Sequence, residues 1–331
     1  MPHRRTIDLL NEERPLLDVV SLGRPGPGRR DHFALGQIAR TVRRTPEVVI
    51  KVSGGARTLR GLALHLDYIG RKGELEIETD DGRRMQEKGF QKKLINDWDL
   101  DLEAHRELSK RAKECGRKPP KLVHNIVFSM PPGTPPSKLF AAVRKFAEDR
   151  FALQHRYAMV LHTDDDHPHV HVVVKAVSEQ GTRLNIRKAT LREWRREFAR
   201  NLREQGVDAN ATERAVRGQT RKPLKDGIYR AAARGASHHL QNRVTAISRD
   251  LASGRFRPGP GQHELRQTHA AVLAGWRTLG ERLAEEGHRG LAYDVRRFVQ
   301  QMAPARTERE QIAADLIARV ERTRSVMPRL R

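Results

Sequence analysis

Cysteine is almost absent from this sequence, because only Cys115 among its 331 residues is a cysteine. One cysteine excludes an intrachain disulfide framework and a zinc site built on cysteine pairs, and it is typical of a reducing compartment. Long apolar runs are missing too. No run of about 18 uncharged apolar residues occurs, which excludes a spanning helix. The first 30 residues carry acids and no apolar stretch of the signal-peptide type. We therefore expect a soluble, cytoplasmic protein with no membrane insertion.

Acidic and apolar residues are also in short supply. Hydrophobic residues make up 37% of the chain and charged residues 32%, which predicts a thin core and helices with long charged faces. Lysine and arginine number 64 against 41 acids, a formal net charge of +23. Such an excess favours a nucleic-acid partner, whose phosphates release counterions when cations bind. An anionic membrane surface fits less well, because no long Trp/Phe/Leu face accompanies the charge.

The positive charge gathers in two clusters. Residues 187–203 and residues 213–234 each hold seven lysines and arginines against two acids. Solvated helix faces are the ordinary alternative interpretation of such clusters. In the first cluster, helical spacing predicts one apolar face that packs into the core. A neighbouring basic face would then be free to bind a DNA strand. The basic face consists of Arg192, Arg196, Arg200 and Arg203.

The apolar pattern predicts an α+β core followed by helices. Strands are expected at 47–52, 122–128, 157–163 and 169–177, with a short hairpin near 75–79. Helices are expected at 58–70, 99–114, from a Ser137 cap to 151, and from a capping box at 190–193 to about 206. Beyond about 235, everything except the Gly/Pro segment 254–262 reads as amphipathic helix. We expect a flexible arm at 1–46, a core domain at 47–225 and a basic helical region at 226–331.

The stretch His162–Lys175 carries the strongest chemical signal. Alternation along a strand puts His169 and His171 on one face and three valines on the other. If the two strands pair as a hairpin across residues 163–168, His162 lies close to both. Three imidazoles then converge, which is the number needed for a catalytic metal with open positions.

The histidines alone leave the metal open. Imidazole suits zinc, iron, nickel or copper better than magnesium. A carboxylate can also orient a ligand histidine through its second ring nitrogen, and Asp164 is the best placed for that role. Asp165 and Asp166 also fit an ordinary turn.

A second feature is Tyr68, one of only four tyrosines, at the end of the predicted helix and just before Arg71 and Lys72. A tyrosine there is ordinarily a packing residue. Near a bound metal and two basic side chains, however, a phenol ionises more readily and can act as a nucleophile.

Three motifs in this order resemble those of the relaxases, the DNA-strand-transferring endonucleases of plasmid mobilisation, in the branch of the T-DNA border endonucleases. Tyr68–Leu75 resembles the nucleophile motif, Asn125–Thr134 the motif whose serine (Ser129 here) contacts DNA, and His162–His171 the metal-binding motif. The resemblance covers roughly 47–220. One departure is Lys175, where the family usually has asparagine.

The resemblance implies an antiparallel-sheet relaxase core and a DNA-nicking mechanism. Tyr68 is then the catalytic nucleophile, and it forms a 5′-phosphotyrosyl link and a free 3′-hydroxyl. His162, His169 and His171 hold a divalent ion, with Mg²⁺ or Mn²⁺ implied by the family and Zn²⁺ also compatible. Asp164 assists catalysis, whereas Arg71 and Lys72 clamp phosphate.

The same resemblance implies partners. The substrate is single-stranded DNA at a transfer origin, and accessory DNA-processing proteins and a type IV secretion coupling protein are expected. Translocation to a recipient cell together with the bound DNA is implied as well, and the basic tail 322–331 resembles the signals read by that secretion channel.

Two other functions compete. A rolling-circle replication initiator uses similar residues, but its tyrosine typically follows the histidines, whereas Tyr68 precedes them. A non-catalytic basic DNA-binding protein with a structural metal would also fit the charge and the histidines. Covalent trapping separates the classes, because only the enzymes form a detergent-resistant adduct with DNA.

Overall fold

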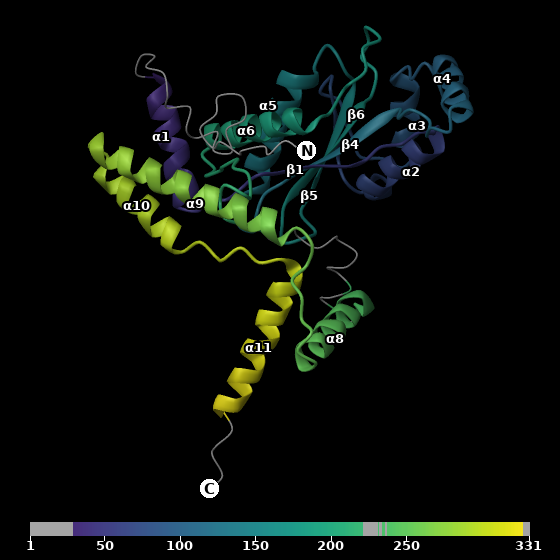
Figure 1. The fold of residues 1–331 in the computed structure, drawn as a ribbon. Coiled ribbons are helices and arrows are strands. Elements are labelled where there is room, and N and C mark those ends of the chain that lie inside the picture. Colours follow the sequence, from purple (N-terminus) through teal and green to yellow (C-terminus); the bar gives the residue numbers. More distant parts are fainter. Residues whose placement is uncertain (1–28, 221–230, 232–233, 236, 327–331) are drawn as a thin grey trace. The chain divides into compact units, whose positions relative to one another are not determined.

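The structure, a computed structural model, describes residues 29–220, 231, 234–235 and 237–326 (Figure 1). The chain divides into two compact units. The sheet unit comprises residues 44–211, and the helical unit comprises the described residues before 44 and after 211. Within the described residues, no helix is long and apolar enough to cross a membrane.

The sheet unit is built on six antiparallel strands in the order β1-β4-β6-β5-β2-β3. The strands are β1 (Val49–Gly54), β2 (Ile77–Thr79), β3 (Arg84–Met85), β4 (Val123–Ser129), β5 (Tyr157–His162) and β6 (His169–Lys175). Its helices are α2 (Leu59–Ile69), the 3₁₀ turn η1 (Arg71–Gly73), α3 (Phe90–Asp97), α4 (Leu102–Glu114), α5 (Pro136–Phe151) and α6 (Lys188–Glu204). An antiparallel sheet with flanking helices is the fold expected from the sequence, and this expectation is confirmed.

Helices cover both faces of the sheet (Figure 1). Val170, Val172 and Val174 point into the core beneath α5 and α6. On the opposite face Val173 packs with Leu62 and other residues of α2 and α3. The strand alternation of β6 therefore sends Val170, Val172 and Val174 to the first face and leaves the two histidines, with Val173, on the α2 face.

Two helix starts differ from the sequence prediction. Helix α5 begins at Pro136, one residue before the predicted cap Ser137, because proline at the first helical position loses no helical hydrogen bond. Helix α6 begins at Lys188, so Thr190 is its third residue rather than its cap. The Thr190 hydroxyl accepts a hydrogen bond from the Arg187 amide at 3.3 Å. In both cases a residue upstream of the predicted cap begins the helix.

The helical unit contains five described helices. They are α1 (Arg29–Val42), α8 (His238–Ala252), α9 (Gln262–Glu285), α10 (Arg289–Gln300) and α11 (Glu308–Val326). Helices α1, α9 and α10 share a core around Trp276, whose indole donates to the Val216 carbonyl at 2.7 Å. An all-helical C-terminal region is thus confirmed.

Helix α1 lies within the segment expected from the sequence to be a flexible arm. Its Ile38 and Val42 are buried in the helical-unit core, so that core joins residues from both ends of the chain. Residues 1–28 of the expected arm, and most of the basic cluster 213–234, lie outside the described residues.

Candidate metal centre and catalytic site

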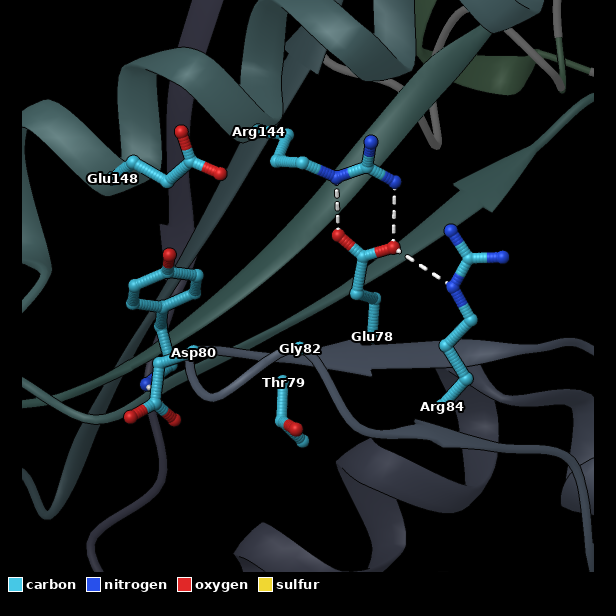
Figure 2. Close-up of a pocket in the computed structure, with 8 residues that line it drawn as sticks. Glu78, Thr79, Asp80, Gly82, Arg84, Arg144 and Glu148 are labelled. Atoms are coloured by element: carbon cyan, nitrogen blue, oxygen red, sulfur yellow. Dashed lines mark hydrogen bonds and ion pairs between the residues drawn. The ribbon is translucent and has the colours of Figure 1, made fainter.

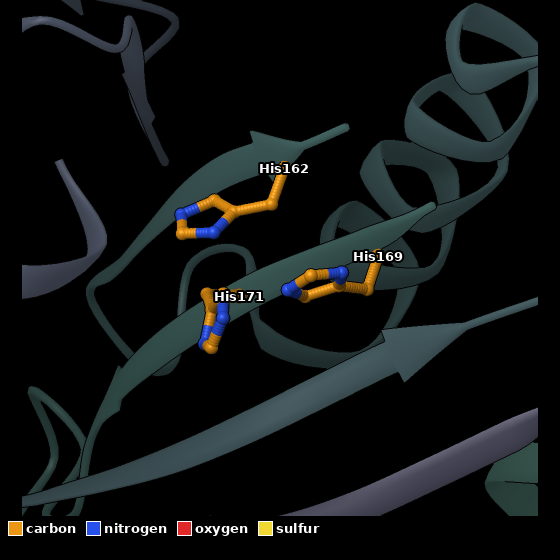
Figure 3. A group of neighbouring side chains, drawn as sticks. All are labelled: His162, His169 and His171. Carbon is orange, nitrogen blue, oxygen red and sulfur yellow. The ribbon is translucent and has the colours of Figure 1, made fainter. Parts of the chain in front are cut away.

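Three histidines converge on the α2 face of the sheet. In the β5–β6 hairpin His162 lies directly opposite His169, and His171 follows two residues later on the same face. The ring centroids of His162 and His171 are 4.6 Å apart, and His169 is 5.1 Å from each. One nitrogen of each ring lies within 4.8 Å of the corresponding nitrogens of the other two (Figure 3). The hairpin that the sequence predicted therefore gathers the three imidazoles, while their role as metal ligands stays a prediction.

The hydrogen bonds of these rings leave nitrogens available for a metal. His162 Nε2 lies 2.7 Å from the Ile69 carbonyl oxygen, and His169 Nδ1 lies 3.0 Å from the His167 carbonyl oxygen. Since a carbonyl only accepts, each of these nitrogens carries the proton and the other nitrogen carries the lone pair. His171 Nδ1 is buried with no hydrogen-bond partner. A divalent ion would satisfy such an orphaned buried nitrogen, so the donor set fits the metal that the motif implies.

Burial keeps two of the rings neutral. The pKa of His171 is lowered to about 3, first by burial and then by the positive charge that His162 and His169 acquire on protonation. The pKa of His162, only 1% exposed, is also lowered, chiefly by burial. Neutral imidazole is the form that binds metals, so the site favours the ligand form well below neutral pH.

Asp164 lies at this site in a different arrangement from the one predicted. Its carboxylate accepts a hydrogen bond from the Arg71 guanidinium at 2.5 Å, whereas its other oxygen is 3.7 Å from His162 Nδ1. The group that orients His162 is therefore the Ile69 carbonyl. The pKa of Arg71 is raised, mainly by its hydrogen bond to Asp164 and further by the Tyr68 side chain.

A tight turn after α2 brings Arg71 to the histidines. Arg71 and Lys72 have left-handed backbones, with φ of 49° and 57°. Gly73 follows with φ of 93°, and a Cβ there would lie 2.5 Å from the Glu87 main chain, so the turn requires glycine. The Arg71 guanidinium then lies 3.4 Å from His162 Nδ1. Lys72 points into solvent.

Tyr68 stands beside this cluster at the end of α2. Its side chain is 59% exposed, and the Arg71 guanidinium lies 5.2 Å from the centre of its ring. The next residue, Ile69, supplies the carbonyl that holds His162. The helix end thus places an accessible phenol and a guanidinium next to the three imidazoles.

His65 is a site residue that sequence analysis missed. Its ring lies between those of Tyr68 and His171, with both centroid distances at 6.4 Å. Its Nε2 is buried without a partner, and burial lowers its pKa. The signal that was available is its spacing, because residues three apart on a helix share a face and His65 precedes Tyr68 by three.

The other predicted DNA contacts divide between the two faces of the sheet. Ser129 lies opposite His169 in the β4–β6 register and therefore on the histidine face. The basic face of α6 does not lie on the histidine face, because Trp194 and Phe198 pack α6 into the core on the opposite side of the sheet. Arg200 also lies 3.6 Å from Glu197 and 3.7 Å from Glu204. Thus Arg192, Arg196 and Arg200 are not gathered with the histidines.

A cavity of about 240 Å³ lies on the α5 side of β2 (Figure 2). The buried Glu78 carboxylate binds the guanidiniums of Arg144 and Arg84 there, so the opposite charges compensate one another. Tyr157 lines the same cavity, is 2% exposed, and has a raised pKa, first because of burial and then because of Glu148. A buried phenol that resists ionisation is a poor nucleophile, so Tyr157 is the weaker candidate for that role.

Comparison with known proteins finds a family that this region resembles. Residues 68–207 match the relaxase family described as MobA/VirD2-like, nuclease domain. The T-DNA border endonuclease VirD2 of Agrobacterium fabrum is 27% identical over 215 residues, which cover 59% of this chain and 46% of that protein. VirD2 of Rhizobium rhizogenes is 27% identical over 210 residues, 57% of this chain and 46% of that protein. The matched segment therefore spans about half the length of these curated relatives.

Among solved structures, a chain described under "Molecular Basis of Vancomycin Resistance Transfer in Staphylococcus aureus" has a TM-score of 0.31. It is 11% identical and covers 51% of this chain and 98% of its own length. A likeness at that level supports no statement about fold or function.

Proposed function

We propose that this protein nicks single-stranded DNA at a transfer origin with Tyr68 as nucleophile, because residues 68–207 match the relaxase family described as MobA/VirD2-like, nuclease domain. The observation that carries the proposal is the meeting of an exposed tyrosine and three converging histidines at the end of α2. A phosphodiesterase that released its product by hydrolysis would have no need of such a tyrosine.

The reaction conserves the energy of the ester. The Tyr68 phenolic oxygen loses its proton and forms a bond to phosphorus, while the bond from phosphorus to the 3′-oxygen breaks. The 3′-oxygen leaves with a proton as a free hydroxyl, and the phosphate stays on the 5′ end of the other fragment, now joined to tyrosine. A later 3′-hydroxyl reverses the step and rejoins the strand.

The surrounding residues supply binding and charge. Arg71 is fixed by Asp164 and lies over the Tyr68 ring, so its guanidinium can hold the phosphate that Tyr68 attacks. Lys72, on the same turn, is exposed and provides a second cation. Ser129, opposite His169 on the histidine face, would contact the strand next to the scissile bond, as the resemblance implies.

His162, His169 and His171 would hold a divalent ion, for which the family resemblance favours Mg²⁺ or Mn²⁺ and the imidazole set also suits Zn²⁺. When bound, that ion supplies Lewis-acid stabilisation of charge on the phosphate oxygens. The lowered pKa values of buried His162 and half-buried His171 support this assignment, because they favour neutral rings.

We further propose that the nicked strand is transferred between bacterial cells. The curated relatives are named for the T-DNA border, a DNA segment, which supports a sequence-defined DNA substrate. Accessory DNA-processing proteins, a type IV secretion coupling protein and passage to a recipient cell with the bound DNA are part of this proposal.

Covalent trapping tests the proposal. The purified protein is incubated with Mn²⁺ and a panel of labelled transfer-origin oligonucleotides, and adducts are resolved on a denaturing gel. We expect an adduct with the wild type that disappears in Tyr68→Phe and with a chelator, while Tyr157→Phe retains it. Peptide mapping of the phosphotyrosine to Tyr157, Tyr229 or Tyr293 would refute the assignment of Tyr68.

A further inference from the structure

Helix α10 of the helical unit presents an exposed tyrosine among arginines. Its inner face, with Val295 and Phe298, is buried in the helical-unit core, so the opposite face points into solvent. Tyr293 lies in the middle of that outer face and is 63% exposed. We call the outer face the Tyr293 face; its exposed residues are Arg289, Gly290, Tyr293, Arg296, Arg297 and Gln300.

One side of the Tyr293 ring is uncovered. A helical side chain lies over the turn that precedes its own Cα, which for Tyr293 is the turn around residue 290. Position 290 is glycine, and a Cβ there would meet no atom within 4 Å beyond its chain neighbours and the backbone of its own helix. Tyr293 is therefore an exposed ring with no side chain at position 290, and an exposed aromatic ring is a surface on which nucleic-acid bases stack.

Three cations surround this ring. Arg289 precedes Tyr293 by four residues, and Arg296 and Arg297 follow it by three and four, so all are neighbours on the helix surface. None of the three forms an ion pair with any described residue. The acid nearest in sequence, Asp294, is already bound to Arg43 at 3.0 Å. Three uncompensated guanidiniums around one phenol repel each other, and an anion placed between them relieves that repulsion.

We infer that the Tyr293 face binds single-stranded DNA, with a base stacked on Tyr293 and phosphates on the flanking arginines. An acidic protein segment would use the arginines but would leave the open ring without a role. The choice of DNA over RNA rests on the proposed function. The surface itself lies in the helical unit, outside the matched nuclease segment 68–207, so it adds a second, sequence-independent grip on the strand.

The test measures the affinity of the full chain for a fluorescein-labelled oligothymidine by anisotropy over a series of salt concentrations, with chelator present. Tyr293→Ala should weaken binding about tenfold, whereas Tyr293→Phe, which keeps the ring, should bind like the wild type. The triple variant Arg289→Gln, Arg296→Gln, Arg297→Gln should reduce the slope of log K against log salt by about 2, at about 0.7 per phosphate contact.

A matched control separates local contacts from net charge. The triple variant Arg249→Gln, Arg277→Gln, Arg319→Gln removes the same charge from exposed positions on three other helices of this unit. It should leave the slope close to that of the wild type. Photocrosslinking with 5-iodouracil in the oligonucleotide should attach DNA to Tyr293.

Equal slopes for the two triple variants, or wild-type affinity in Tyr293→Ala together with no crosslink at Tyr293, would overturn the inference. This result is separable from failure of the proposed function, because oligothymidine binding needs no cleavage. The inference fails if the Tyr293-face variants bind normally, whereas the proposed function fails if the wild type forms no adduct through Tyr68.

Discussion

Acidifying the metal-free protein should destabilise the sheet unit through His171. Its folded-state pKa is lowered to about 3, mainly by burial. In the unfolded chain the same imidazole titrates near pH 6.5, so below that pH the unfolded state binds a proton that the folded state does not. The stability tied to this group is therefore fully present above pH 6.5, and it is lost as the pH falls from 6.5 toward 3.

The size of the effect follows from the width of that window. Each pH unit in which only the unfolded state is protonated costs about 1.4 kcal/mol, so the step from pH 6.5 to 5 costs about 2 kcal/mol. The pKa of His162 is lowered as well, which adds a loss of the same sign. A loss of about 2 kcal/mol is measurable in a domain whose free energy of unfolding is about 5–15 kcal/mol.

Urea unfolding in chelator at pH 7 and pH 5 measures the effect. A Trp276→Phe background restricts the fluorescence signal to the sheet unit, whose tryptophans are Trp98 and Trp194. Between the two pH values the parent should lose about 2 kcal/mol more than His171→Gln, which has no titratable group at that position. The exposed His167→Gln serves as control and should behave like the parent.

An equal pH dependence in the parent and in His171→Gln would refute the reasoning. That result would mean that His171 accepts a proton in the folded state near its ordinary pKa, and the neutral, metal-ready site described here would then be wrong. A pH dependence of opposite sign would refute it equally.

Other expectations follow from the site, the turn and the tail. His169→Ala should weaken Mn²⁺ binding by at least about 100-fold in calorimetry, since even outer-shell partners are worth 10- to 100-fold, whereas an equal loss in His167→Ala would point to a different ligand set. Gly73→Ala should cost about 3 kcal/mol in urea unfolding because a left-handed backbone and a main-chain contact at 2.5 Å both oppose it. Gly82→Ala, also left-handed but with open space around it, should cost only about 1 kcal/mol, and equal costs would contradict the contact argument. Deletion of residues 322–331 should leave nicking in vitro intact and lower DNA transfer between cells, while loss of both would mean that the tail supports the fold or the DNA grip.

The β5–β6 hairpin that carries the histidines is a part of the site that local sequence patterns predict. Alternation over 169–175 sets which side chains share a face, and the short turn before it forces β5 to pair with β6. His162, His169 and His171 therefore converge from local information alone. The same holds for α2, whose apolar spacing and Thr58 cap place Tyr68 in its last turn.

Contacts between residues from distant segments of the chain could not be predicted from such local patterns. The sequence offered Asp164 as the orienting group for His162 because the two are neighbours in the chain. In the fold, the end of α2 delivers a nearer acceptor, the Ile69 carbonyl, and Arg71 takes the carboxylate. For His65 the sequence offered only its spacing of three from Tyr68, and the packing of α2 on the sheet is what sets its ring beside His171.

The sequence by itself determined the strands, most of the helices and the set of histidines, because hydrophobic period and turn residues act within a few residues of each other. Tertiary structure alone decided which helix covers which face of the sheet. It set the Arg-rich helix α6 on the side away from the histidines and buried α1 residues with the C-terminal helices. These arrangements depend on which apolar surfaces from distant segments bury each other best. Because the hydrophobic effect is non-directional, the local sequence pattern does not predict which surface a given helix packs against.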